Sequence, residues 1–147
     1  MLMTSLHESS SLPEIFQNGI VAIVDDDEHI GRAITMLMQL KNVEAVSFAS
    51  AEALLQAVEP RDGQIWLQGK SEKLPVQFAV IDLNLPGMSG TALAHRLREL
   101  VPQLRMVIMT AAMPDERALH GPEPEGVGCL TKPFRIADLE KVLSGEH

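Results

Sequence analysis

The sequence predicts an α/β fold built on a single, doubly wound, five-stranded parallel sheet. Short apolar runs rich in Val, Ile and Met recur along the 147-residue chain, which is typical of strands buried on both faces. Between these runs, apolar residues recur at spacings of three and four, the pattern of amphipathic helices. Because strand and helix alternate, right-handed crossovers are expected to place helices on both faces of the sheet.

Four of the five expected strands lead into a polar residue. The strands cover residues 20–24, 43–48, 78–81, 106–109 and 127–131. Asp25 follows the first strand, Asp82 the third, Thr110 the fourth and Lys132 the fifth. In parallel sheets, ligands bind beyond the carboxyl ends of the strands. We therefore expect these four residues to project from one edge of the sheet and to form a site.

Each expected helix carries one apolar stripe. The stripes consist of Ile30, Ala33, Ile34, Leu37 and Leu40; Ala51, Leu54, Leu55 and Val58; Leu93, Leu97, Leu100 and Val101; and Ile136, Leu139, Val142 and Leu143. Ser50 is expected to cap the second helix and Pro60 to end it. A brief helix is also expected to start at residues 114–116 and to stop at the Gly and Pro residues of 121–124.

The chain is long enough for one domain, which we expect at residues 19–147. Residues 1–18 have no sustained period and are expected to form a loosely ordered leader. Residues 60–75 fit neither the helical nor the strand period, and they are expected to form a long polar loop that carries Trp66.

Composition excludes several classes of function. The net charge of −8 argues against direct binding to nucleic acid, which needs clustered Lys and Arg. A single Cys cannot form an internal disulfide, and no Cys or His spacing is typical of a zinc site. Neither a signal peptide nor an apolar run long enough to span a membrane is present, so a cytoplasmic protein without a membrane partner is expected.

The polar residues at the predicted edge suit phosphoryl chemistry. Asp25, Asp26 and Asp82 offer hard oxygen ligands, which favour Mg²⁺ or Mn²⁺ over softer metals. Lys132 adds a compact positive charge for a phosphoryl oxygen, and the Thr110 hydroxyl can donate to another. An Asp carboxylate can attack phosphorus to form a mixed anhydride. The adjacent acids Asp27 and Glu28 are interpreted as residues that interact favourably with the helix dipole.

Four segments in order resemble the receiver domain of two-component response regulators. These are residues 23–28 (IVDDDE), 82–90 (DLNLPGMSG), 107–111 (VIMTA) and 130–134 (LTKPF), and the resemblance extends roughly over residues 19–144. It implies a flavodoxin-like (βα)5 fold with strand order 2-1-3-4-5. It also implies a phosphorylation-dependent signalling switch that catalyses only its own phosphorylation and dephosphorylation, without acting as an enzyme on other substrates.

The same resemblance implies a role for each site residue. Asp82 accepts a phosphoryl group from a phosphohistidine on a sensor histidine kinase or a phosphotransfer protein, and a downstream output protein or domain reads the result. Asp26 and Asp82 bind Mg²⁺ or Mn²⁺ directly, Asn84 contributes its backbone carbonyl, and Asp25 acts through water. Thr110 and Lys132 hold the phosphoryl oxygens, and the Lys132–Pro133 peptide bond is expected to be cis.

The chain departs from the family pattern at two places. The family usually has an aromatic switch residue three positions before the Lys, where this chain has Cys129. Cys129 is interpreted as a small buried hydrophobic residue, so that switching relies on Thr110 and on loop motion. The short fourth helix alters the family's usual partner and dimer face, and the oligomeric state stays open.

Two other functions are each consistent with part of this pattern. A phosphohydrolase of the haloacid dehalogenase type would use Asp25 as its nucleophile, but it needs a further acidic pair after a late strand and leaves Asp82 without a role. A receiver-like module that docks proteins without being phosphorylated is consistent with the missing aromatic residue, although the complete set of acids, Thr and Lys argues against it.

Overall fold

The computed structural model describes residues 19–68, 74–111 and 122–144. The predicted leader at residues 1–18 and the start of the brief helix at residues 114–116 lie outside the described residues. Within the described residues, no helix combines the length and the hydropathy that a membrane span requires.

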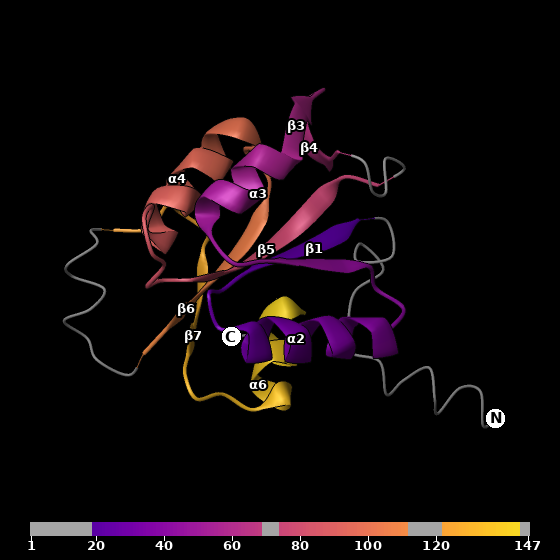
Figure 1. Cartoon of the computed structure of the whole chain (residues 1–147), viewed down its shortest axis with the longest axis vertical. Helices are drawn as coiled ribbons and strands as arrows, with labels where there is room; N and C mark the ends of the chain where they lie inside the picture. Colours follow the sequence, from indigo (N-terminus) through magenta and orange to yellow (C-terminus); the bar gives the residue numbers. More distant parts are fainter. Residues whose placement is uncertain (1–18, 69–73, 112–121, 145–147) are drawn as a thin grey trace.

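A five-stranded parallel sheet forms the centre of the domain, with the order β2-β1-β5-β6-β7 (Figure 1). Its strands are β1 (Ile20–Val24), β2 (Ala45–Phe48), β5 (Val76–Asp82), β6 (Arg105–Thr110) and β7 (Gly128–Thr131). Numbered among themselves, these strands have the predicted order 2-1-3-4-5. All residues of β1 are buried, which explains its uninterrupted apolar sequence. The predicted fold class is confirmed.

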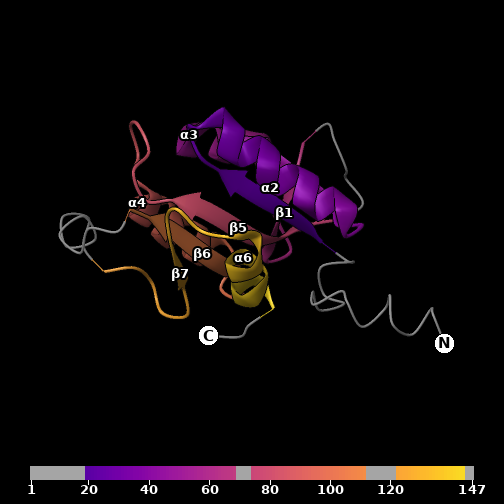
Figure 2. The ribbon, with the colours of Figure 1, turned by 90° about the horizontal axis from the view of Figure 1, so that it is seen from below.

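Helices cover both faces of the sheet, and each pair completes a separate hydrophobic core (Figures 1 and 2). On one face lie α3 (Ala51–Ala57) and α4 (Gly90–Leu100), and on the other α2 (Glu28–Leu40) and α6 (Ile136–Leu143). The first pair contributes Ala51, Leu54, Leu93, Ala94 and Leu97 to its core, and the second pair Ile34, Leu37, Met38, Leu139 and Leu143. The sheet is therefore doubly wound.

Side-chain caps define where three helices begin. Asp27 accepts a hydrogen bond from the backbone N–H of His29 at the start of α2. Ser50 accepts from Ala53 N–H at the start of α3, as predicted, and Ser89 accepts from Ala92 N–H at the start of α4. Each cap satisfies an N–H that has no partner within the helix.

The predicted stripe of α2 is wrong at Ala33 and at Leu40, which are both exposed. Leu40 is 81% exposed, whereas Met38 is fully buried beside Ile34 and Leu37. At about 100° per residue, Leu40 lies roughly 100° around the helix from the centre of the buried stripe. The buried face of α2 consists instead of Gly31, Ile34, Leu37 and Met38, and Met38 lies about 160° around the helix from Leu40.

The loop predicted at residues 60–75 contains a β-hairpin. Strands β3 (Val58–Arg61) and β4 (Gln64–Leu67) pair antiparallel, and the intervening Asp62 and Gly63 have φ values of 57° and 75°. Two consecutive positive φ angles favour an Asp-Gly turn of the type that joins hairpin strands. Pro60 lies within β3 rather than at the helix end, because α3 ends at Ala57 and the chain continues directly into the strand.

The hairpin is anchored through its apolar side chains. Val58, Ile65 and Leu67 are buried in the core that contains α3 and α4. The guanidinium carbon of Arg61 lies 4.7 Å from the centre of the Trp66 ring, and the indole N–H donates to the Arg61 carbonyl at 3.2 Å. Trp66 therefore packs within the hairpin, in contact with Arg61.

Candidate functional site

The carboxyl ends of β1, β5, β6 and β7 bring four polar residues to one edge of the sheet. In the strand register, Val24 pairs with Ile81, so Asp25 and Asp82 follow neighbouring positions. Asp82 pairs with Met109, and Thr110 pairs with Thr131, directly before Lys132. The parallel register thus places all four residues within two residue positions of the same level.

Three carboxylates meet at this edge. Asp25, Asp26 and Asp82 each offer an oxygen, and these oxygens lie within 4.8 Å of one another. Asp25 and Asp82 are buried, whereas Asp26 is exposed. Like charges at this separation repel, so the cluster favours a neighbouring cation.

Lys132 provides one positive charge to the cluster. Its Nζ donates to Oδ2 of Asp25 at 3.0 Å and lies 3.4 Å from Oδ1 of Asp82. Its backbone N–H donates to the Thr110 carbonyl at 2.7 Å, which fixes the start of the Lys132 side chain relative to β6. Oδ1 of Asp25 accepts from the Asp27 N–H at 2.9 Å. Asp25 is thus hydrogen-bonded through both carboxylate oxygens.

The environment of Asp82 favours its protonated form. Burial raises the pKa of Asp82 from 3.8 to about 6, and the Asp25 charge adds to this effect. Lys132 and a hydrogen bond from the Asn84 N–H act in the opposite direction. Burial alone would lower the pKa of Lys132, but its hydrogen bond to Asp25 and the charge of Asp82 raise the pKa overall. The ionised form of Asp82 is therefore destabilised in this site.

The remaining predicted site residues lie at or near the same edge. The buried Thr110 hydroxyl donates to the Ala111 carbonyl at 3.0 Å. Asn84 lies in the β5–α4 loop, defined here as residues 83–89, and its N–H donates to Asp82. Cys129 is half-buried on β7 and pairs with Ile108. The Lys132–Pro133 peptide bond is cis, as expected.

The donor set fits a hard divalent cation. Three carboxylates face one ammonium group, so the cluster keeps an excess of negative charge. Carboxylate and carbonyl oxygens are the ligands that Mg²⁺ and Mn²⁺ prefer. Because Asp26 is exposed, a hydrated ion can reach the cluster from solvent.

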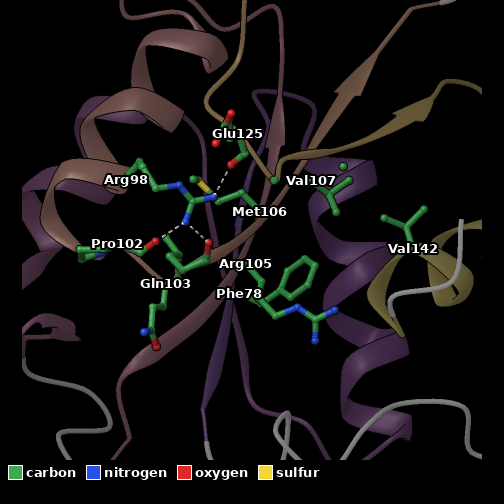
Figure 3. A pocket seen from close by; sticks show the side chains of 12 residues that line it. Phe78, Arg98, Pro102, Gln103, Arg105, Met106, Val107, Glu125 and Val142 are labelled. Atoms are coloured by element: carbon green, nitrogen blue, oxygen red, sulfur yellow. Dashed lines mark hydrogen bonds between the residues drawn. The ribbon is translucent and has the colours of Figure 1, made fainter.

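A cavity at the opposite edge of the sheet has a different character (Figure 3). It has a volume of about 630 Å³ and is lined by the amino ends of β5, β6 and β7 together with Arg98 and the turn before β6. The guanidinium of Arg98 donates to the backbone carbonyls of Pro102, Leu104 and Glu125. Its charge thus holds backbone segments together.

Sequence reasoning missed a residue that contacts the site from outside. Glu52 of α3 accepts a hydrogen bond from the Met88 N–H, in the β5–α4 loop, at 2.9 Å. An acid in the first turn of a helix is usually interpreted as a residue that favours the helix dipole. No periodicity or motif in the sequence connects Glu52 with a loop 36 residues away.

The family model of the response regulator receiver domain matches residues 21–144. The chain belongs to this family. The DNA-binding transcriptional regulator NtrC of Escherichia coli (strain K12) is 27% identical over 132 residues, which are 87% of this chain and 25% of NtrC. The response regulator protein TmoT of Ectopseudomonas mendocina is 28% identical over 123 residues, which are 84% of this chain and 50% of TmoT. The receiver domain thus spans a quarter to a half of the length of these relatives.

Solved receiver structures share the fold. A response regulator receiver domain protein from Clostridium thermocellum has a TM-score of 0.66 at 19% identity, covering 86% of this chain and 92% of that chain. The chemotaxis protein CheY4 of Vibrio cholerae has a TM-score of 0.62 at 21% identity, covering 88% and 98%. As a receiver domain of response regulators, the chain is a phosphorylation-dependent switch of two-component signalling.

Proposed function

We propose that Asp82 is the phosphoryl acceptor of this receiver domain. The observation that carries the proposal is the position of its buried carboxylate, 3.4 Å from Lys132 and within 4.8 Å of two further carboxylates. An Asp82 oxygen attacks the phosphorus of a phosphohistidine and forms an acyl phosphate. The phosphorus–nitrogen bond breaks, and the imidazole nitrogen keeps the electron pair and takes up a proton.

Asp82 suits this role better than Asp25. Both oxygens of Asp25 are held, one by the Asp27 N–H and one by Lys132, and its side chain is fully buried. Asp82 retains 10% exposure of its side chain and makes a longer contact with Lys132. Asp82 also accepts from the Asn84 N–H, but its partial exposure makes its carboxylate the more accessible of the two to phosphorus. This difference favours Asp82 as the nucleophile and disfavours a hydrolase that uses Asp25.

A divalent cation is part of the proposal. Asp26, Asp82 and the backbone carbonyl of Asn84 would hold Mg²⁺ or Mn²⁺, and Asp25 would act through a bound water. When bound, the cation offsets the negative charge of the phosphoryl oxygens. The exposure of Asp26 and the mutual distances of the three carboxylates support this assignment.

Thr110 and Lys132 complete the phosphoryl site. Lys132 lies next to Asp82 and can donate to a phosphoryl oxygen while it remains near Asp25. The Thr110 hydroxyl has to leave the Ala111 carbonyl before it can donate to another phosphoryl oxygen. This exchange of partners links phosphorylation to the end of β6, and it supports Thr110 as the switch residue where Cys129 replaces the family's aromatic residue.

The partners follow from this chemistry. The phosphoryl donor is a histidine kinase or a phosphotransfer protein, and the readout is a downstream output protein or domain. We place the domain in the cytoplasm and assign it no reaction beyond its own phosphorylation and dephosphorylation. The names of the relatives, which include a DNA-binding regulator, support a role in signalling.

The proposal is tested with a small phosphodonor. The protein is incubated with Mg²⁺ and phosphoramidate, and the labelled residue is identified by mass spectrometry. We expect one phosphoryl group on Asp82 and its loss in Asp82→Asn. Asp27→Asn is the matched control, because Asp27 is a neighbouring exposed acid that caps α2. Label that persists in Asp82→Asn, or that is found on Asp25, contradicts the proposal.

A further inference from the structure

A carboxylate outside the acidic cluster holds the loop that follows Asp82. Glu52 is the second residue of α3, and its Oε2 accepts from the Met88 N–H at 2.9 Å. This hydrogen bond joins two segments of the chain that lie 36 residues apart. The Met88 N–H lowers the pKa of the Glu52 carboxyl group, as expected for a bond to the ionised form.

The loop approaches Glu52 closely along its backbone. Gly87 has a φ of +75°, and a Cβ atom at this position would lie 2.6 Å from Oε2 of Glu52. A residue with a side chain at position 87 would therefore displace the carboxylate. The glycine and Glu52 together allow the middle of the β5–α4 loop to lie against the start of α3.

The two ends of the loop are fixed by backbone contacts. The Leu83 N–H donates to the Met109 carbonyl at 2.8 Å, and the Gly90 N–H donates to the Leu83 carbonyl at 3.0 Å. A Cβ atom at Gly90 would overlap the Asp82 carbonyl oxygen, so only glycine lets the start of α4 lie this close to the end of β5. Between these ends lies Asn84, whose N–H donates to the Asp82 carboxylate.

Glu52 is itself held on a rigid support. Ser50 caps α3, and Ala51 and Leu54 are fully buried in the hydrophobic core. The Glu52 side chain is exposed, so its contribution to packing is small. Its position is therefore set by α3, and its carboxylate accepts hydrogen bonds from the Met88 N–H in the loop and from its own backbone N–H.

We propose that Glu52 is a positioning residue for the metal and phosphoryl site. By holding the Met88 N–H, it keeps the β5–α4 loop in the place where Asn84 can offer its carbonyl to a cation beside Asp82. Glu52 thereby increases the affinity of the acidic cluster for Mg²⁺ without contacting the cation. This inference rests on the proposed function, because it assumes that the cluster binds a divalent cation.

The test measures Mg²⁺ binding directly, by a titration followed through the backbone amide signals of Asp82 and Asn84. Residues that orient metal ligands typically change metal affinity 10- to 100-fold, and for an exposed residue we expect the lower end, roughly tenfold weaker binding in Glu52→Ala. Glu52→Gln keeps an oxygen acceptor for Met88 and should recover much of this loss. The Met88 amide signal should move in Glu52→Ala and exchange faster with solvent.

Glu99→Ala is the matched control. Glu99 is an exposed acid on α4 whose charge interacts with Arg96, so its removal changes the net charge by the same amount. We expect Mg²⁺ affinity within about twofold of wild type, because a screened surface charge has a small effect at a distance. A loss in Glu99→Ala equal to that in Glu52→Ala would overturn the positioning role.

A kinetic readout separates positioning from general damage. In labelling with phosphoramidate, Glu52→Ala should require a higher Mg²⁺ concentration for half-maximal rate and reach nearly the same rate at saturation. If wild-type protein and Glu52→Ala bind Mg²⁺ equally well, this inference is overturned and the proposed function is not. Wild-type protein that neither binds Mg²⁺ nor is labelled on Asp82 overturns the proposed function, and the inference with it.

Discussion

The two edges of the sheet use charge in opposite ways. At the carboxyl edge, Asp25, Asp26, Asp82 and Lys132 direct their charged groups toward one another. At the amino edge, Arg98 directs its charge to three backbone carbonyls in the turn before β6 and in the segment before β7 (Figure 3). The first arrangement leaves an excess of charge that a ligand can neutralise, whereas the second uses its charge to hold the fold together.

This contrast shows that the presence of a cavity does not by itself indicate the functional site here. The amino-edge cavity of about 630 Å³ brings together guanidinium and amide groups that support the chain. The carboxyl edge has a small cluster with a strongly raised pKa on one acid. A shifted pKa within a cluster of like charges is a more direct indication of a functional site than the presence of a cavity. If the two edges are functionally separate, substitutions at the carboxyl edge should change phosphorylation and substitutions at the amino edge should change stability alone.

The largest effect is expected for Lys132→Ala. Its ammonium group lies near Asp82 and follows β7, so it connects the phosphoryl site to that strand. Loss of one charged donor at a transition state typically slows a reaction 100- to 1000-fold, and we expect labelling to slow roughly 100-fold. Label that does form should leave the β7 amide signals unchanged. Signals of β7 that still move on phosphorylation would contradict this.

The second largest effect is expected on the pH dependence of the free energy of unfolding when no metal is bound. The pKa of Asp82 rises from 3.8 to about 6 on folding, so the folded state binds more protons than the unfolded state between these values. The contribution of Asp82 to the free energy of unfolding therefore falls as the pH rises from 4 to 6. At about 1.4 kcal/mol per pKa unit, the loss at pH 7 is roughly 2 to 3 kcal/mol.

Asp82→Asn isolates this contribution from the other acids. Denaturant unfolding without Mg²⁺ should show the variant more stable than wild type at pH 7 by roughly 2 to 3 kcal/mol, and the difference should vanish below pH 4. Added Mg²⁺ should reduce the difference, because it stabilises the wild-type carboxylate cluster. Equal stability of the two proteins at pH 7 without metal would show that folding does not destabilise the ionised form of Asp82.

At the amino edge, Arg98→Ala should lower stability and spare the chemistry. Three backbone carbonyls lose a charged donor in this variant. Because these hydrogen bonds are partly exposed, we expect the free energy of unfolding to fall by about 1 to 2 kcal/mol. Arg96→Ala is the control, since its ion pair with Glu99 is exposed and should contribute less than about 0.5 kcal/mol. Labelling of Asp82 should stay within about twofold in both, and a larger change would mean that the edges are coupled.

The smallest effect is expected at the hairpin turn, which also lines a cavity at the amino edge. Gly63 has a φ of +75° and open space where a Cβ atom would lie, so Gly63→Ala meets backbone strain alone. The expected cost is about 1 kcal/mol, with Gly63→Asn less affected because Asn tolerates this conformation. Chemical unfolding measures the cost, and no loss in Gly63→Ala would rule out the Asp-Gly turn described here.

Much of the fold and the site could be predicted because both follow from local patterns. Buried parallel strands are continuous apolar runs, and the residues that end them necessarily meet at one edge. The hairpin also had a local signal in Asp62-Gly63, but the surrounding polar residues favoured interpretation as a loop. Leu40 shows the opposite error, since an apolar residue near the right spacing lies on the exposed side of α2.

The amino-acid sequence alone determined the parallel sheet, its order of strands and helices, and the residues that the carboxyl edge presents. Only the tertiary structure decided that Lys132 lies closer to Asp25 than to Asp82, and that Glu52 reaches the loop after Asp82. The reason is that periodicity records burial along one element, whereas these contacts depend on how elements pack against each other. A hydrogen bond between segments far apart in the chain leaves no period in either of them.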